Sequence, residues 1–203
     1  MSSDAVAAVA PGPRNSGDPD APRGRRSRET FDNLVAAAVN VLRESSYSGL
    51  TVRAVAARAS VAPATAYTYF ASKNHLLAEV YLGLVRQAPY FTDVNDSMFT
   101  RVNKVLRHLA LVVADEPEVA AACTTALLSD NDRAVRKVQA SIGAEIGRRI
   151  RSAVGPNADP RIVPALEMTY FGALVDAGSG AFTYHHIADR LTQAVATIIG
   201  EQR

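Results

Sequence analysis

Apolar residues recur every three or four positions along most of this chain, and almost no stretch alternates apolar and polar residues at every second position. That period is typical of amphipathic α-helices and not of strands. Glycine, proline and capping Ser, Thr or Asp residues interrupt the pattern at intervals. We therefore predict an all-α protein with nine helices, over about 27–45, 52–59, 62–70, 73–88, 98–113, 117–128, 133–154, 160–175 and 184–199.

The segment 50–77 carries the most specific pattern, two short helices joined by a tight turn and followed by a longer one. Thr51 is a good N-cap for the first short helix, and Pro63 suits the first position of the second. The second begins with small residues and ends with aromatic ones. Small side chains let a backbone approach base edges, and a threonine can bond a base or touch a thymine methyl. The pattern predicts a helix-turn-helix that enters a DNA major groove.

The order Leu-Thr-x-x-x-Val-Ala, then Val-Ala-x-x-Thr-x-Tyr-x-Tyr-Phe-x-Ser-Lys-x-x-Leu-Leu, resembles the DNA-binding domain of the TetR (tetracycline-repressor) family over about 26–85. The chain departs from the family at Pro63-Ala64 (often Ser-Gly), Ala66 (a larger aliphatic) and Tyr69 (usually His). These differences concern the DNA sequence bound and not the fold. The resemblance implies a nine-helix TetR-like architecture, with an N-terminal helix-turn-helix head and a C-terminal helical bundle.

Charge supports the same division of the chain. Between 23 and 73 there are eight Lys or Arg and three acidic residues, a net +5, whereas the whole chain carries +2. A basic module on a mildly acidic body is expected of a phosphate-binding domain with a separate effector domain.

We expect Thr65, in the first turn of the recognition helix, to read bases and Thr51, Tyr67 and Lys73 to hold phosphates, as the family positions matching Tyr67 and Lys73 do, while Arg53 could do either. The predicted DNA-binding residues are Arg25, Arg26, Thr51, Arg53, Ala62, Ala64, Thr65, Tyr67, Tyr69 and Lys73. The alternative for Tyr67 and Tyr69 is packing, and we expect at least one of these rings to serve the core of the head.

The predicted domains are a disordered tail over 1–24, the DNA-binding domain over 25–87, and an effector-binding and dimerisation domain over 88–203. The tail is rich in Pro, Gly, Ser, Asp and Ala. It ends in an arginine-rich stretch, 23–28, that is either a solvated hinge or an arm against phosphates or the minor groove.

The second half devotes many large apolar residues to its helices, and the helix 117–128 is dominated by alanine. Small residues at the centre of a bundle leave room between larger neighbours, so we predict a small apolar effector there, with space beside Ala121 and Ala122. The layout loosely resembles TetR-type regulators of actinobacterial lipid and sterol catabolism, whose effectors are often acyl-CoA thioesters. The predicted lining is Phe99, Leu106, Leu127, Met168, Tyr170, Phe171 and Leu174.

The last two helices carry more apolar surface than a small bundle needs. In the family that this chain resembles, two such helices pair with their symmetry mates in a twofold dimer, which also presents two recognition helices to one face of DNA. The predicted interface residues are Ile187, Leu191, Val195 and Ile198. The alternative is that these stripes face the chain's own core.

Other chemistries find little support in the sequence. The adjacent His185 and His186 would point about 100° apart on a helix, and no Cys or carboxylate lies at ligand spacing. There is one cysteine, no phosphate loop or catalytic motif, and no apolar run long enough to cross a bilayer. We expect no metal, no cofactor, no enzymatic activity, no membrane partner and a cytoplasmic location.

The predicted function is a homodimeric repressor released from a palindromic double-stranded operator by an apolar effector. The rival prediction is an architectural DNA-binding protein with a filled bundle and no effector.

Overall fold

The computed structural model describes residues 21–89, 93, 95–128 and 132–200, and its regular elements there are nine helices and no strands. The predicted all-α class and nine-helix architecture are confirmed. The helices are α1 (Ala21–Glu44), α2 (Val52–Arg58), α3 (Pro63–Tyr69), α4 (Lys73–Gln87), α5 (Met98–Leu111), α6 (Pro117–Leu127), α7 (Arg133–Val154), α8 (Ile162–Gly178) and α9 (Tyr184–Ile199).

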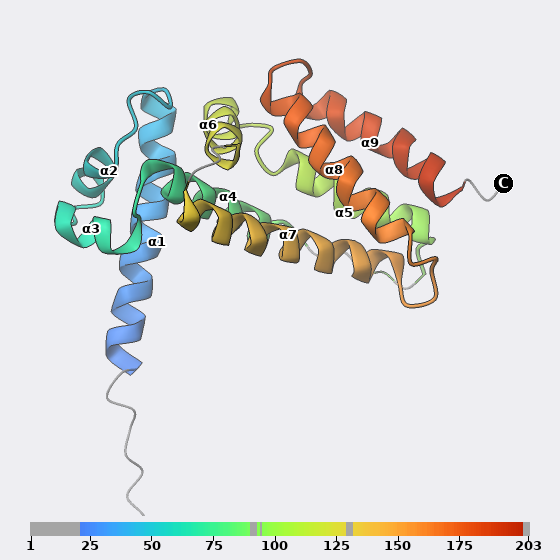
Figure 1. The fold of residues 1–203 in the computed structure, drawn as a ribbon, viewed down its shortest axis with the longest axis horizontal. Coiled ribbons are helices and arrows are strands. Elements are labelled where there is room, and N and C mark those ends of the chain that lie inside the picture. Colours follow the sequence, from blue (N-terminus) through green and yellow to red (C-terminus); the bar gives the residue numbers. More distant parts are fainter. Residues whose placement is uncertain (1–20, 90–92, 94, 129–131, 201–203) are drawn as a thin grey trace, which may run out of the picture.

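The helices form a small head and a larger body (Figure 1). Helices α1 to α3 make the head, and α4 leads from it into the body, where it packs against α6 and α7. At the far end, α8 and α9 form an antiparallel hairpin that packs on α5. None of the described helices is both long and apolar enough to cross a membrane.

Local sequence sets most helix boundaries as predicted. The Thr51 hydroxyl accepts the Ala54 N–H at 3.0 Å, and Pro63 occupies the first turn of α3. The N-terminal boundary of α1 differs from the prediction. It begins at Ala21 and not near 27, because residues 25–44 contain no helix breaker and proline is tolerated in a first turn. Of the predicted disordered tail, residues 1–20 lie outside the described part of the chain.

The head has its own apolar core. Leu34 and Leu42 of α1 are fully buried with Val55 of α2 and Phe70, the residue that ends α3. The Phe70 ring lies 5.2 Å from the ring of Phe31, centroid to centroid. Burial of these side chains holds α3 against α1, so the head moves as a unit with the start of α4.

The buried Arg149 of α7 holds the end of α4. Its side chain is 5% exposed and donates to the carbonyl oxygens of Ala88 at 2.8 Å and Arg86 at 3.1 Å. These carbonyls end α4 and have no partner within the helix, so the guanidinium caps it. Glu145 supplies the countercharge, with a 2.7 Å contact to the Arg149 Nε atom. Burial works against ionisation of Glu145, but hydrogen bonds from Arg148 and Arg149 outweigh it and lower its pKa.

The starts of α4 and α7 are joined as well. Ser72, the N-cap of α4, donates its hydroxyl hydrogen to Asp132, the N-cap of α7, at 2.5 Å. Helices α4 and α7 therefore run side by side in the same direction, bonded at both ends (Figure 1).

We expect Arg149→Ala to lower the free energy of unfolding by about 3 kcal/mol, because it leaves buried carbonyl oxygens without a donor and removes one partner of Glu145. Arg148→Ala is the control. Arg148 also contacts Glu145 but is 58% exposed, so its loss should cost less than about 1 kcal/mol. Urea unfolding at one fixed protein concentration measures both. If the two substitutions lowered the free energy of unfolding equally, Arg149 would not act as the cap of α4.

Candidate nucleic-acid interface and ligand cavity

The turn between α2 and α3 is tight enough to require an unusual backbone. Ser60 adopts a φ of 55°, in the left-handed region that favours glycine. The Ser60 and Val61 N–H groups bond back to carbonyls of α2, at 3.1 and 2.9 Å. The strained residue is held by these bonds and sets the angle at which α3 leaves α2.

Helix α3 presents one polar and small-residue face to solvent. Ala62, Ala64, Thr65 and Tyr67 are exposed, whereas Ala66 is fully buried against the head. Tyr67 is 54% exposed, which is high for an aromatic residue. An exposed face of small residues, a threonine and a tyrosine is the arrangement predicted for contact with base edges and phosphates.

Two of the predicted DNA-binding side chains are engaged inside the head. The Tyr69 and Ser27 hydroxyls lie 3.0 Å apart, and the Tyr69 ring packs edge-on against Phe31. The Lys73 ammonium donates to the Tyr47 carbonyl oxygen at 3.2 Å and lies 3.9 Å from the centre of its ring. Tyr69 thus has a packing role in this structure, and Lys73 would have to leave Tyr47 to reach a phosphate.

The other predicted contacts remain at the surface. Arg53 is exposed on α2, and the Thr51 hydroxyl, which accepts from Ala54, still has a hydrogen to donate. Arg25 and Arg26 are exposed on α1, with Arg25 3.9 Å from Glu29. The basic stretch is therefore helical from Ala21 and projects from the head as a rod (Figure 1).

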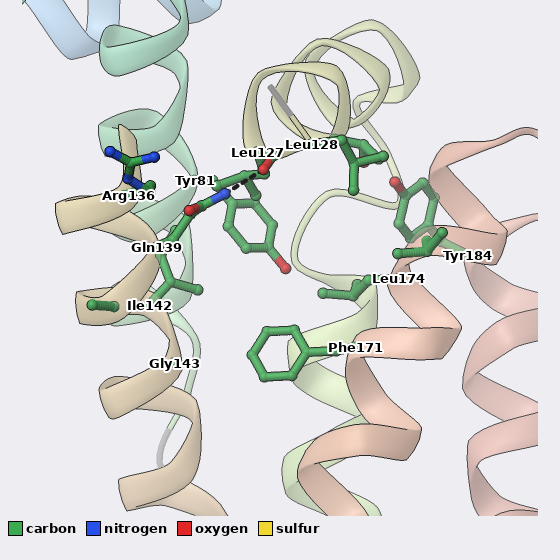
Figure 2. Close-up of a pocket in the computed structure, with 13 residues that line it drawn as sticks. Tyr81, Leu127, Leu128, Arg136, Gln139, Ile142, Gly143, Phe171, Leu174 and Tyr184 are labelled. Carbon is green, nitrogen blue, oxygen red and sulfur yellow. Dashed lines mark hydrogen bonds between the residues drawn. The ribbon is translucent and has the colours of Figure 1, made fainter. Parts of the chain in front are cut away.

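A cavity of about 590 Å³ opens in the body between α4, α6, α7, α8 and the start of α9 (Figure 2). Three of the predicted ligand-binding residues line it, Leu127, Phe171 and Leu174. The residues that complete its lining come from α4, α6 with its C-cap, α7, α8 and α9. They are Tyr81, Thr124, Leu128, Arg136, Gln139, Ala140, Ile142, Gly143, Val175 and Tyr184.

The remaining predicted ligand-binding residues lie elsewhere. Leu106 and Tyr170 are fully buried in the core, Met168 is 77% exposed on the outside of α8, and Phe99 is partly exposed on α5. Tyr170 and Phe171 are neighbours in sequence but point in different directions, because successive helical residues are turned by about 100°.

The expected space beside Ala121 and Ala122 is not this cavity, although Ala121 lines a separate hollow of about 530 Å³ between Pro117 and Phe182. Ala121 is exposed and Ala122 is fully buried, and neither lines the cavity. The alanine-rich helix does border the cavity, but with its last turn, through Thr124, Leu127 and Leu128.

The polar groups of the cavity wall are the hydroxyls of Tyr81, Thr124 and Tyr184, the amide of Gln139 and the guanidinium of Arg136, and Tyr170 lies behind the wall. The hydroxyls of Tyr81 and Tyr170 lie 3.3 Å apart, and Tyr170 donates to the Leu109 carbonyl oxygen at 3.1 Å. Burial raises the pKa of both phenols, and burial also raises the pKa of Tyr184. Phenols are uncharged at neutral pH, the charged Arg136 of the lining is exposed, and most of the lining is apolar, so the wall suits a mainly apolar ligand.

Tyr81, Gln139 and Tyr184 were not predicted as cavity residues. Gln139 donates to the Leu127 carbonyl oxygen and so joins α7 to the end of α6 (Figure 2). These residues are separated by dozens of positions in the sequence and share no motif. Only the packing of α4, α6, α7 and α9 brings them to one cavity.

Three of the four residues predicted to form the dimer interface are buried within a single chain, so their assignment to the interface is wrong. Ile187, Leu191 and Val195 are at most 2% exposed within a single chain, where α9 packs on α5 and α8. They serve the chain's own core and present no side chain to a partner. Ile198 is only partly buried. The exposed apolar residues of this hairpin lie on α8, at Met168, Phe171 and Val175.

Other candidate chemistries gain nothing from the fold. Cys123 is buried, and burial raises the pKa of its thiol to about 12, so it is not a thiolate at neutral pH. In the described part of the chain, no three His, Cys, Asp or Glu side chains gather in a way that could hold a metal ion.

Comparison with known proteins agrees with this arrangement. The family model described as bacterial regulatory proteins, tetR family, matches residues 34–80, which span most of the head. Uncharacterized HTH-type transcriptional regulators of Mycobacterium bovis and Mycobacterium tuberculosis are each 67% identical over 178 residues, 87% of this chain and 84% of the relative.

Solved structures share the fold at low sequence identity. A TetR transcriptional regulator from Rhodococcus sp. RHA1 superposes with a TM-score of 0.72 at 20% identity, covering 89% of this chain and 99% of that one. Thermus thermophilus FadR, a TetR family repressor in complex with lauroyl-CoA, gives 0.63 at 15% identity, covering 85% and 96%.

The head and the body thus define a helix-turn-helix DNA-binding protein that regulates transcription. More particularly, the chain belongs to the TetR family, as the mycobacterial relatives and the match over the head show. The family is one of bacterial regulatory proteins, and these relatives are named as transcriptional regulators.

Proposed function

We propose that this protein is an effector-controlled repressor that binds a palindromic operator as a homodimer and is released by a small apolar molecule. The cavity carries this proposal. Its wall includes Tyr81 of α4, and α4 begins directly after the recognition helix α3. A change in the cavity therefore has a short mechanical route to the DNA-binding surface.

Release would follow from a difference in affinity. An effector shifts the conformational equilibrium only as far as it binds one conformation better than the other. The effector must favour a conformation in which the two heads of the dimer no longer match the spacing of the half-sites. Helix α4 would transmit the change, because Tyr81 near its middle belongs to the cavity wall and its first turn adjoins the head.

The effector class that we propose is an acyl thioester or a similar lipid-derived molecule. A cavity of about 590 Å³ lies in the usual range for small-molecule sites, and most of its lining is apolar. Arg136 and Gln139 lie together on α7 at one side of it (Figure 2), where a polar headgroup could bond. The bound lauroyl-CoA of the Thermus thermophilus repressor supports this class. An architectural DNA-binding protein without an effector would need no such cavity.

The decisive experiment is to sequence the DNA fragments that the protein retains from its own genome. We expect an inverted repeat whose half-site centres lie about 34–36 Å or a multiple of that apart. Retention of DNA without any shared sequence would favour the architectural alternative, and no retention would contradict the proposal.

On that DNA, Thr65→Ala should change the preferred base at one position of each half-site, because Thr65 is exposed in the first turn of α3. Arg53→Ala should weaken binding to all sequences alike and reduce the salt slope by about 1, as expected for a phosphate contact. Fluorescence anisotropy over a salt series measures both. If Arg53→Ala changed sequence preference while Thr65→Ala did not, the two roles would be reversed.

Lauroyl-CoA should raise the melting temperature of the protein and release it from the operator, because a ligand of the folded state stabilises it by mass action. Gly143→Trp should abolish both responses. A Cβ at Gly143 meets no atom within 4 Å, so the indole can occupy the cavity. Ala144→Trp is the matched control, since Ala144 is exposed on the same helix and lines no part of the cavity. Equal responses in the two variants would place the ligand elsewhere.

Met168→Glu should convert the dimer to monomers without unfolding them, because Met168 is 77% exposed on the apolar face of α8. Leu191→Glu should instead lower the melting temperature steeply, since it places a charge in the core of the chain. Light scattering and thermal unfolding distinguish the two effects. A dimeric Met168→Glu variant would show that this face of α8 lies outside the interface.

A further inference from the structure

The hydrogen bond between Ser72 and Asp132 joins two helix caps directly. The Ser72 oxygen accepts the His75 N–H at 3.1 Å while its hydrogen goes to the Asp132 Oδ2 atom at 2.5 Å. The other oxygen of Asp132 accepts the Ala134 N–H at 2.8 Å. Each side chain thus caps its own helix, and the two caps are bonded to each other.

One side of this contact belongs to the DNA-reading head. Ser72 follows Phe70 by two residues, and Phe70 is both the C-cap of α3 and a fully buried residue of the head core. Between them, the Ala71 N–H donates to the His75 ring nitrogen at 3.2 Å. The end of α3 and the start of α4 are therefore rigidly connected, and a displacement of Ser72 displaces the recognition helix.

The other side belongs to the cavity. Helix α7 begins directly after Asp132, and its first three turns contribute more residues to the lining than any other helix does. Those residues are Arg136, Gln139, Ala140, Ile142 and Gly143. A ligand that presses on this wall moves the first turns of α7, and Asp132 moves with them.

We propose that the Ser72–Asp132 hydrogen bond is the contact through which occupation of the cavity reaches the recognition helix. This rests on the proposed function, because it assigns the route by which the effector acts. Ser72 and Asp132 are positioning residues, since neither lines the cavity. The Ser72 hydroxyl is the main cause of a lowered Asp132 pKa, so the bond is charge-assisted at neutral pH and stronger than a neutral one.

Two other routes compete with this contact: Tyr81 places α4 itself in the cavity wall, and a second polar contact joins α1 to the start of α6. Arg43 of α1 holds Glu116, just before α6, with its Nε atom 3.0 and 3.1 Å from the two carboxylate oxygens. Both side chains are substantially exposed, 53% and 33%, and surface ion pairs contribute little. This contact also attaches to the C-terminal end of α1, away from the junction of α3 and α4.

The test uses Gly143→Trp as a permanently occupied cavity and compares its effect in four backgrounds of the full chain. These are the unchanged chain, Asp132→Ser, Ser72→Thr and Glu116→Gln. Serine at position 132 still caps α7 but is too short to reach Ser72, whereas threonine at position 72 keeps both the cap and the donor. Glu116→Gln weakens the competing contact. Because Ser and Thr are preferred caps, each of the two cap substitutions should leave its own helix formed.

Two readouts are measured, hydrogen exchange of the backbone amides of residues 70–76 and affinity for the selected genomic DNA. With the contact intact, Gly143→Trp should speed exchange at this junction and weaken DNA binding about fivefold or more, the lower end of typical coupling. In the Asp132→Ser background, Gly143→Trp should change both the exchange rate at the junction and the affinity for DNA by less than about twofold. They should persist with Ser72→Thr and with Glu116→Gln.

Three results would overturn the proposal. Gly143→Trp could leave exchange at the junction unchanged in the unaltered chain, its effect could survive Asp132→Ser in full, or Glu116→Gln could remove it. Hydrogen exchange needs no DNA, so the coupling is tested even if the protein retained no DNA and the proposed function failed. Loss of the effect with both Asp132→Ser and Ser72→Thr would indicate a merely structural role.

Discussion

The rest of the structure depends on the parallel pairing of α4 with α7. At one end the caps Ser72 and Asp132 bond to each other, and at the other the buried guanidinium of Arg149 holds the last carbonyls of α4. An isolated helix frays at its ends because its terminal polar groups lack partners. Here both ends of α4 are satisfied from outside or by capping, so the helix that joins head to body behaves as a stiff element.

This stiffness gives the cavity its place in the molecule. Tyr81 puts α4 into the cavity wall, while Gln139 binds the end of α6 and ties that helix to α7 (Figure 2). The wall combines the hydroxyls of Tyr81, Thr124 and Tyr184 and the amide of Gln139 with a mainly apolar lining, and its charged residue, Arg136, is exposed. Such a wall can distinguish ligands by shape and by a few hydroxyl contacts without the desolvation cost of a buried ion.

The predicted elements succeeded where the information is local. Thr51 and Pro63 mark helix starts through their own chemistry, and the structure uses them as predicted. The prediction of the dimer interface failed because it depended on which apolar faces are buried within the chain. The apolar stripe of α9 was assigned to a partner chain, yet Leu191 and Val195 fill the protein's own core. Periodicity identifies an apolar face but does not say which surface covers it.

The sequence by itself determined the nine helices, the position of the helix-turn-helix and the family to which it belongs, because caps, breakers and motif spacing act over a few residues. Tertiary structure decided which of these residues meet. It turned Tyr69 and Lys73 toward the head, left Thr65 and Tyr67 at the surface, and assembled the cavity from helices far apart in the chain. Those outcomes depend on how helices pack against one another, and packing is set by the shapes of all the contacting side chains together.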